Sequence, residues 1–448
     1  MSLTKNSQTT KLELFPLSSE INNKGHLSIA GLDTIELVEK YASPLYVIDE
    51  ETFRDRANKY INSIKKYYKD FLVLYAAKAF ACTSILKLAN TLNLGIDVVS
   101  GGEIYTALKA NTKKEFIYFH GNNKTADELK LAVKNNIGKI ICDNFYELEL
   151  LQKIAKENNT TAQILIRLTP GIECHTHEYI KTGHLDSKFG FDLENLDEVL
   201  NYIKSKGMNL VLKGFHAHIG SQIFELKPFS DTVDVLLENF KIAKEKYGFE
   251  LSEINIGGGI GIKYVNEDDP ITIDDWAKTT TDAIKNKCSK LNLNLPKLIC
   301  EPGRSLIGPS GITLYKVGSS KQVPNGRKFI SVDGGMADNP RPITYQAKYS
   351  AVVANKMNEK ETELVTIAGR YCETGDILIK DINLPKVSPG DIIAVPNTGA
   401  YNYSMSSNYN MVPRPACVLL HKGKSEIIIE REDYEFVIKN QKIANWLQ

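Results

Sequence analysis

Residues 71–78 read Phe71-Leu72-Val73-Leu74-Tyr75-Ala76-Ala77-Lys78, an apolar run that ends in a lysine. An uninterrupted apolar run of this length is typical of a strand buried on both faces, as in a parallel sheet. The small and apolar neighbours of Lys78 would desolvate its ammonium, which favours the neutral amine that a Schiff-base lysine needs. Taken alone, the stretch is better explained by a surface lysine at a strand end, so its role depends on the rest of the chain.

Seven further runs of strand length follow the first one, and amphipathic helical stretches such as 125–135 and 229–247 lie between them. The seven runs are 95–99, 116–120, 139–143, 163–168, 211–218, 254–256 and 298–300. Buried, non-alternating strands that alternate with helices indicate a parallel sheet. Eight such units predict a closed (β/α)8 barrel of the TIM type rather than an open doubly wound sheet.

The pattern changes after Arg304, where segments of alternating polarity are separated by Gly and Pro. These segments are 311–317, 328–332, 350–353, 363–368, 391–396 and 425–430. They predict an antiparallel β domain, and we expect an isolated N-terminal strand at 12–17 to join its sheet. The predicted organisation is therefore a barrel over 46–308 and a β-sandwich or β-barrel domain built from 1–45 and 309–448.

The composition excludes several classes of protein. The 448 residues carry 55 Lys and Arg against 54 Asp and Glu, so nothing favours binding to nucleic acid or to an anionic membrane. We find no apolar run of about 18 residues that would predict a membrane span, and residues 1–10 lack the apolar core of a secretory signal. Seven scattered cysteines without CxxC spacing suit a reducing compartment, and we expect a cytoplasmic enzyme.

Reactive residue types follow all eight runs, at the ends where a barrel of this kind has its active site. In chain order they are Lys78, Asp97 with Ser100, His120, Asp143, Arg167, His216 with His218, Gly257-Gly258-Gly259, and Glu301 with Gly303 and Arg304. Any one of them could be an ordinary core or loop residue. Their occurrence at every strand end predicts a functional site.

The glycines at 257–259 and Arg304 form a predicted phosphate cradle, because glycine lets backbone N–H groups approach phosphate oxygens closely. A phosphate site together with a strand-end lysine suggests pyridoxal 5'-phosphate. Lys78 would be the Schiff-base lysine, His218 would cover the ring face and Glu301 would keep the ring nitrogen protonated. Ser221 would join the phosphate cradle.

Two other chemistries stay open on the residues alone. His175, His177 and His184 have spacing that could hold zinc, although they lie in a long insert after the fifth run. Cys372, followed by Glu373, could be a nucleophile, but the chain has no Gly-x-Ser-x-Gly elbow. We predict no metal site.

Three motifs resemble those of the diaminopimelate decarboxylase family, PLP enzymes with the alanine-racemase-like fold. They are Tyr75-Ala-Ala-Lys78-Ala, His216-Ala-His218-Ile-Gly-Ser221-Gln and Glu301-Pro-Gly-Arg304-Ser, and related ornithine and arginine decarboxylases share them. The resemblance covers about residues 43–415.

Other features favour diaminopimelate as the substrate. The loop His177-Glu-Tyr-Ile-Lys-Thr-Gly183 with Ser187-Lys-Phe-Gly190 looks like a signature of the family, which weakens the zinc interpretation. Cys372-Glu-Thr-Gly-Asp376 resembles the Cys-Glu-Ser-Gly-Asp of the family, with Thr374 in place of Ser. Arg370-Tyr371 departs from the family, which more often has a Pro near this point.

The resemblance implies decarboxylation of meso-diaminopimelate to L-lysine and CO2, the last step of lysine biosynthesis. It implies that Cys372 supplies a proton, that Arg304 and Arg341 bind the distal carboxylate and that Glu373 reads the distal ammonium. Tyr345 and Tyr401 would add hydrogen bonds, Tyr401 also near the phosphate. It further implies a homodimer with shared active sites.

The alternatives are an ornithine, arginine or polyamine-precursor decarboxylase, an amino-acid racemase of the same fold, a PLP carrier without activity and a metal-dependent barrel hydrolase. A decarboxylase of ornithine or arginine would have no need of Arg341. A racemase would prefer a weaker electron sink than the one Glu301 provides, and a PLP carrier would have no use for Cys372.

Overall fold

A computed structural model describes residues 11–172 and 187–448 of the chain. It divides into two compact units. The barrel unit comprises Asp55–Ile262 and Asp269–Leu306, and the sheet unit comprises Met1–Arg54, Lys263–Asp268 and Ile307–Gln448. Among the helices of the described ranges, none has the length and apolar character needed to cross a membrane.

Parallel strands form a closed ring in the barrel unit, which confirms the predicted (β/α)8 barrel. The ring closes because β13 pairs with β5 and β8 pairs with β9. Its strands in order are β5 (Phe71–Ala76), β6 (Gly95–Val98), β7 (Ile117–Phe119), β8 (Lys139–Cys142), β9 (Ala162–Thr169), β11 (Leu210–His216), β12 (Glu253–Asn255) and β13 (Lys297–Cys300). The short β10 (Phe191–Asp192) adds to the edge of β9.

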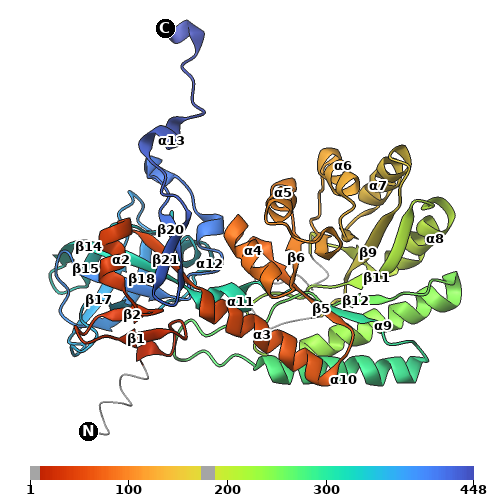
Figure 1. Cartoon of the computed structure of the whole chain (residues 1–448), viewed down its shortest axis with the longest axis horizontal. Helices are drawn as coiled ribbons and strands as arrows, with labels where there is room; N and C mark the ends of the chain where they lie inside the picture. Colours follow the sequence, from red (N-terminus) through yellow and green to blue (C-terminus); the bar gives the residue numbers. More distant parts are fainter. Residues whose placement is uncertain (1–10, 173–186) are drawn as a thin grey trace. The chain divides into compact units, whose positions relative to one another are not determined.

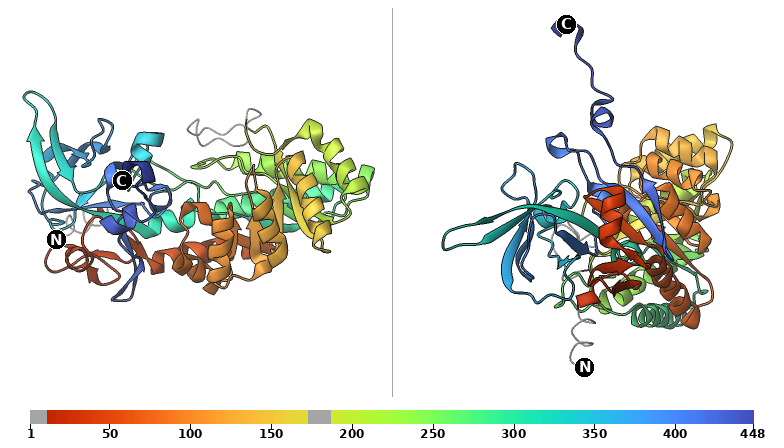
Figure 2. Two further views of the ribbon diagram at one scale, coloured as in Figure 1. Left: turned by 90° about the horizontal axis from the view of Figure 1, so that it is seen from above. Right: turned by 60° about the vertical axis from the view of Figure 1, so that its left-hand side comes forward.

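Helices surround the ring, as Figure 1 and both views of Figure 2 show. They are α3 (Glu50–Tyr67), α4 (Thr83–Thr91), α5 (Gly101–Lys109), α6 (Ala126–Asn135), α7 (Phe145–Glu157), α8 (Leu196–Lys206), α9 (Lys227–Tyr247) and α10 (Ile273–Leu291), followed by the short α11 (Arg304–Ile307). Polar side chains fix where several helices begin: Thr125 and Glu128 form a reciprocal capping box on α6, and Asn144 caps α7. Side chains such as Leu74, Tyr118 and Ile299 from several strands pack together as a buried cluster.

The sheet unit has a second large sheet, with strand order β18-β17-β15-β14-β4-β20-β21, and β19 pairs with β14 and β16. The strands are β4 (Leu45–Asp49), β14 (Gly311–Gln322), β15 (Lys328–Val332), β16 (Val352–Val353), β17 (Glu363–Ala368), β18 (Ile377–Leu384), β19 (Ile392–Pro396), β20 (Ala416–His421) and β21 (Lys424–Ile429). Most pairs are antiparallel as predicted, whereas β15 with β17 and β4 with β20 are parallel.

The strand predicted at 12–17 is wrong. Leu14 and Phe15 are neighbours in sequence and both are buried, which an alternating strand does not allow, and Pro16 has no N–H to donate to a sheet. Backbone turns close there instead, with the Phe15 N–H donating to the Leu12 carbonyl at 2.9 Å. The N-terminal strand that enters the large sheet is β4, which pairs with β14 and β20, so the barrel unit begins at Asp55 and not at 46.

A small separate sheet is formed by the residues between the N-terminal turns and β4. It is built from β1 (Ser19–Ile21), β2 (Leu27–Ile29) and β3 (Leu32–Asp33), and α2 (Thr34–Tyr41) follows it. Leu27, Ile29 and Leu37 pack with β4, β14 and β20 in the core of the sheet unit. This arrangement places the N-terminal segment in the core of that unit.

Candidate active site

Lys78 lies in a single 3-10 turn (Ala77–Ala79) at the carboxyl end of β5 and is partly exposed between two buried alanines. Two hydrogen bonds to backbone carbonyls fix the turn: Tyr75 Oη donates to the Phe80 carbonyl at 2.6 Å, and the Ala76 N–H donates to the Pro302 carbonyl at 3.1 Å. The second contact joins the end of the first barrel strand to the motif after the last one.

Glu301 follows β13 and is buried among three polar side chains from other strand ends. His120 Nε2 lies 2.8 Å from its Oε1, His216 Nε2 lies 3.3 Å from its Oε2, and Asn255 Nδ2 donates to Oε1 at 2.6 Å. Both oxygens of the carboxylate are therefore engaged by groups of the protein.

The electrostatics favour an ionised Glu301. Burial would raise the pKa of its carboxyl, but the interactions with His120 first and His216 second, hydrogen bonds among them, hold that pKa well below its usual range. Burial also lowers the pKa of the His216 imidazole to about 3, so that histidine is neutral at ordinary pH. The result is a negative charge at the bottom of the barrel mouth.

Asn255 is a residue of this cluster that sequence reasoning missed. It ends β12 and is fully buried, and besides its bond to Glu301 its Oδ1 accepts from the Gly257 N–H at 3.0 Å. It thus ties the carboxylate to the first glycine of the predicted phosphate cradle. Its place two residues before that glycine was the available signal.

His218 stands beside the same glycine turn. Its Nδ1 accepts from the Gly258 N–H at 3.2 Å, which places the proton of the neutral ring on Nε2. Burial lowers the pKa of His218 well below its usual range, and the positive charges of Lys78 and Arg167 add to this effect.

The glycines of the turn are required by close packing. A Cβ on Gly257, whose φ is +65°, would lie 2.8 Å from His218 Nδ1, and one on Gly258 would lie 2.3 Å from the Glu301 carbonyl. A Cβ on Gly303 would lie 3.0 Å from that of Ala76, next to Lys78. Only glycine lets these segments approach one another.

Ser221 and Arg304 lie together at the same end of the barrel. Arg304 begins α11 and is buried, and its Nε and Nη2 donate to Ser221 Oγ at 3.2 and 3.0 Å. A hydroxyl, a guanidinium and a glycine turn are the groups that a phosphate-binding site uses.

The remaining strand ends contribute charged groups around this centre. Asp97 Oδ1 lies 3.7 Å from His120 Nε2, and burial raises the pKa of the Asp97 carboxyl. Arg167 lies 3.9 Å from Asp143 and stacks on Phe189, with its guanidinium carbon 4.2 Å from the ring centre. The structure therefore brings together the reactive residues that the sequence placed at separate strand ends.

This arrangement fits pyridoxal phosphate. An amine, an anionic carboxylate, a neutral imidazole and a glycine cradle with a hydroxyl and a guanidinium all lie at one end of the barrel. The ligand atoms of His120, His216 and Glu301 also lie within 4.8 Å of one another, a spacing that a metal ion could use. The two interpretations make opposite predictions about chelators.

Arg341, in the sheet unit, is the first residue of α12 (Arg341–Tyr345) and is buried. Its Nη1 donates to Tyr349 Oη at 2.7 Å, and its guanidinium carbon lies 4.6 Å from the centre of the Tyr264 ring. Although burial opposes the charge, the two tyrosines raise the pKa of Arg341. The hydrogen-bond partner of Arg341 is thus Tyr349, which sequence reasoning missed, whereas Tyr345 is half-buried at the end of the helix.

Cys372 and Glu373 are exposed on a loop that a buried carboxylate organises. Asp376 accepts from the Tyr371 N–H at 2.8 Å and from the Met336 N–H at 2.7 Å. The Cys372 N–H itself donates to Asn410 Oδ1 at 3.2 Å. The thiol is therefore held on a braced loop at the surface of the sheet unit.

Tyr401 lies in the same unit, in the left-handed region with φ +60°, on the turn that follows β19. The turn is fixed at its start, since Asn397 Nδ2 donates to the Leu14 and Lys263 carbonyls at 3.1 and 2.9 Å. A fixed turn in an unusual backbone conformation suits a side chain that must be aimed.

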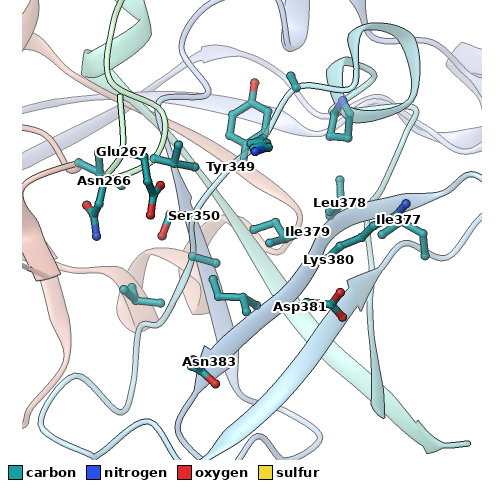
Figure 3. A pocket seen from close by; sticks show the side chains of 18 of the residues that line it. Asn266, Glu267, Tyr349, Ser350, Ile377, Leu378, Ile379, Lys380, Asp381 and Asn383 are labelled. Atoms are coloured by element: carbon teal, nitrogen blue, oxygen red, sulfur yellow. The ribbon is translucent and has the colours of Figure 1, made fainter. Parts of the chain in front are cut away.

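A cavity of about 1220 Å³ also lies in the sheet unit, between β18 and the stretch after α12 (Figure 3). Its lining includes Tyr349, Glu267 and Lys380, and it includes none of the residues predicted to bind the cofactor. Tyr349 connects its wall to Arg341.

The histidines at 175, 177 and 184 and most of the signature loop lie outside the described residues.

Comparison with known proteins gives a consistent result. Residues 54–308 match the family described as pyridoxal-dependent decarboxylase, pyridoxal binding domain. The chain is 49% identical over 450 residues to the diaminopimelate decarboxylase of Synechocystis sp., covering 98% of this chain and 95% of that protein. It is 44% identical to the enzyme of the same name from Bacillus subtilis, over 94% and 96% of the two chains.

Solved structures agree with this result. The diaminopimelate decarboxylase of M. jannaschii in complex with L-lysine has a TM-score of 0.90 and 36% identity, covering 96% of this chain and 99% of that one. The Helicobacter pylori enzyme, also complexed with L-lysine, has a TM-score of 0.83 and 34% identity, over 91% and 98%. A lysine/ornithine decarboxylase from Vibrio vulnificus, at 19% identity and TM-score 0.73, shares the fold alone.

Proposed function

The chain belongs to the diaminopimelate decarboxylase family, and from that premise we propose that it converts meso-diaminopimelate to L-lysine and CO2 with pyridoxal phosphate as cofactor. The observation that carries the proposal is the cluster at the barrel mouth, where Lys78, His218 and an anionic Glu301 lie beside a glycine cradle. When bound, the cofactor supplies an electron sink for the electron pair that departing CO2 leaves behind.

The barrel residues hold and tune that sink. Lys78 would attach the cofactor through its ε-amine, and the glycines at 258, 259 and 303 with Ser221, Arg304 and Tyr401 would hold the phosphate. Glu301 would face the ring nitrogen, where its negative charge would favour the protonated form of the ring. His218 would cover the ring face as a neutral imidazole, since a protonated imidazole would repel a positively charged pyridinium.

Residues of the sheet unit would select the substrate. Arg341 with Arg304 would bind the distal carboxylate, because a guanidinium fork matches a carboxylate with two hydrogen bonds. Tyr345 and Tyr401 would donate hydrogen bonds, and Glu373 would pair with the distal ammonium. The carboxylate that leaves as CO2 is the one on the reacting carbon, so the product L-lysine would keep the distal carboxylate and ammonium that these residues bind.

Cys372 would deliver a proton to the carbon that loses CO2, since a thiol can act as a general acid. Its exposed position on a braced loop suits a thiol that reaches a site on a second chain. We therefore propose a cytoplasmic homodimer in which Cys372 and Glu373 complete the site of the partner.

The test is release of CO2 from meso-diaminopimelate by the purified protein, measured against L-ornithine, L-arginine and L-lysine at equal concentration. We expect turnover of meso-diaminopimelate and at least about 100-fold lower kcat/KM for the others. These three amino acids have no distal carboxylate, so in the site they would leave the buried Arg341 without that partner. Preference for ornithine or arginine would support the related decarboxylases instead.

A chelator separates the cofactor interpretation of the Glu301 cluster from the metal interpretation. Dialysis against EDTA should leave turnover unchanged, and dialysis against hydroxylamine, which removes an aldehyde cofactor, should abolish it until pyridoxal phosphate is restored. Loss of turnover with EDTA, and its return with zinc, would assign His120, His216 and Glu301 to a metal ion.

A further inference from the structure

Lys124 is a buried cation of the barrel unit to which the proposed chemistry gives no role. Its side chain is 1% exposed, and a lysine is rarely buried to this extent unless its charge is paired. Its ammonium donates to the Gly121 carbonyl at 2.7 Å, to the Ile141 carbonyl at 2.7 Å and to Glu147 Oε1 at 2.8 Å. Because an ammonium has three N–H donors, these contacts give every one of them an acceptor.

Glu147 extends this contact to the next strand end. It lies in the first turn of α7, and its side chain is 2% exposed. Its Oε2 accepts from the Asp143 N–H at 3.1 Å, and its own N–H donates to Asn144 Oδ1 at 3.0 Å. Burial raises the pKa of the Glu147 carboxyl, and the charge of Lys124 opposes this effect. Lys124 and Glu147, which we call the buried pair, therefore join the turn after β7, the strand β8 and the start of α7.

The buried pair fixes the backbone next to His120. His120 follows β7, and its N–H donates to the Val98 carbonyl at the end of β6 at 2.8 Å. The next residue, Gly121, has φ +124°, a region that glycine enters freely, so its own backbone does not fix the turn. The hydrogen bond from Lys124 to the Gly121 carbonyl supplies the missing constraint. The backbone of His120 is thus held on both sides, and its Nε2 lies 2.8 Å from Glu301 Oε1.

The buried pair also fixes the position of Asp143. The Asp143 N–H is bound by Glu147, and the carbonyl of Ile141, two residues earlier, is bound by Lys124. Asp143 is buried and its Oδ1 lies 3.9 Å from Arg167 Nη1. Because Arg167 belongs to the cluster around the predicted cofactor site, the buried pair is connected to two strand ends of that site.

Stability alone is a weak explanation for the buried pair. The desolvation of two charges offsets much of their attraction, and apolar residues of similar volume often stabilise a fold equally well. Apolar residues would not supply directed hydrogen bonds to the Gly121 and Ile141 carbonyls and to the Asp143 N–H. The contribution specific to the buried pair is therefore the geometry of the two strand ends.

We propose that Lys124 and Glu147 are positioning residues for the cofactor, because the buried pair holds His120 against Glu301. This role rests on the proposed function, in which Glu301 faces the ring nitrogen. Burial raises the pKa of the Glu301 carboxyl, and His120 makes the largest opposing contribution. Without the buried pair His120 is no longer held at this distance, and Glu301 loses part of the support for the negative charge that the ring requires.

The test uses two variants of the buried pair and one matched control. Lys124→Met removes the charge and the three donors at similar side-chain length. Glu147→Gln is milder, since its amide oxygen can accept from Lys124 or from the Asp143 N–H but not from both. The control is Lys139→Met, because Lys139 Nζ lies 3.3 Å from Glu253 Oε1 in another buried pair. Lys139 and Glu253 begin β8 and β12, at the end of the barrel opposite the predicted site.

Cofactor-free forms of the four proteins are titrated with pyridoxal phosphate and followed by absorbance, and their thermal midpoints are measured. We expect Lys124→Met to raise the dissociation constant of the cofactor at least about 10-fold, and Glu147→Gln about 3-fold or more. Lys139→Met should lower the thermal midpoint, since it also leaves a buried glutamate without its partner, but it should keep the dissociation constant within about 2-fold. An equal rise in Lys124→Met and Lys139→Met, or an unchanged constant in both variants of the buried pair, would overturn the proposal.

Steady-state kinetics at saturating cofactor separates positioning from general loss of structure. Lys124→Met should lower kcat for meso-diaminopimelate about 10-fold and change KM less, because the buried pair acts on the groups around the ring and not on the distal carboxylate. A rise in KM alone would contradict this role. A raised cofactor dissociation constant with no decarboxylation by any of the four proteins would reject the proposed substrate and keep the positioning role. Normal decarboxylation by all four, with unchanged cofactor constants, would do the reverse.

Discussion

Glu301 shows how single residues set the chemistry of this protein. A buried carboxylate without partners would take up a proton, and it would then be useless for holding a ring nitrogen in its charged form. Here Asn255 donates to one oxygen at 2.6 Å, and His120 and His216 lie 2.8 and 3.3 Å from the two oxygens. The carboxylate of Glu301 therefore stays ionised because these three side chains stabilise its negative charge.

Asn255→Ala should weaken cofactor binding, because it removes a buried hydrogen bond to a charged group and frees the Gly257 turn. A loss of about 1.5–3 kcal/mol corresponds to a cofactor dissociation constant about 10- to 100-fold higher. Titration of cofactor-free protein, followed by absorbance, measures it. The matched control is Asn239→Ala in α9, whose buried amide donates to the Val235 carbonyl within its own helix. An equal effect of both changes would mean that Asn255 only stabilises the fold.

Asp338 predicts a pH dependence of stability in the sheet unit. Burial raises the pKa of its carboxyl to about 7, while Tyr315 Oη and the Gly335 N–H donate to it at 2.6 and 2.9 Å. The folded form thus holds a proton that the unfolded chain releases near pH 4, so the contribution to stability is complete below about pH 4 and is lost as pH rises through 7.

Asp338→Asn should remove this slope. The thermal midpoint of the unmodified chain should fall between about pH 4 and pH 8, by the equivalent of up to about 4 kcal/mol, more steeply than that of the variant. Asp391→Asn is the contrasting control, because the pKa of Asp391 is lowered and its contribution changes only at more acidic pH. Parallel pH profiles for the unmodified chain and Asp338→Asn would show that Asp338 is ionised throughout.

At the scale of elements, strands whose signal is local could be predicted and pairings between distant segments could not. The eight buried runs and the reactive residues after them predicted the barrel and the place of its site. The strand β18, interrupted by Lys380 and Asp381, and β20 were not predicted. The pairing of β4 with β20 joins segments more than 300 residues apart, and no local pattern encodes it. Tyr349 was missed for the same reason, since its role depends on which residue faces it in the folded chain.

The Cys372 loop is an element whose shape depends on Asp376. A Cβ on Gly369 would lie 2.1 Å from Asp376 Oδ2, so the carboxylate fills the space under the loop. Asp376→Ala would leave the Tyr371 and Met336 N–H groups without their acceptor and release the loop that carries the thiol.

We expect Asp376→Ala to lower kcat about 10-fold or more, while KM for meso-diaminopimelate changes less, because the proposed role of the loop is to supply a proton after the substrate has bound. Steady-state kinetics measures both constants. The control is Asp381→Ala in β18. This change removes an exposed ion pair between Asp381 and Arg327 and should leave both constants unchanged. A rise in KM alone would give the loop a binding role instead of a proton-transfer role.

At the scale of the whole molecule, the residues proposed for the active site belong to both units. Lys78, His218, Ser221, Glu301 and Arg304 belong to the barrel unit, and Arg341, Tyr345, Cys372, Glu373 and Tyr401 belong to the sheet unit. The thiol is exposed at the surface of its unit, on a loop that Asp376 organises. This division makes it testable whether one active site draws on two chains.

Mixing two inactive variants decides that question. Lys78→Ala disables the barrel of one chain and Cys372→Ala disables the loop of the other, so in a dimer with shared sites the mixed pair has one site in which both residues are intact. Random exchange makes half of the dimers mixed, and decarboxylation should reach about a quarter of that of the unmodified enzyme. The control mixes Lys78→Ala with His218→Ala; both defects lie in the barrel, so no mixed site is intact and no activity should return. If the first mixture stays as inactive as the control, each site is built within one chain, and the exposed thiol must reach its own barrel.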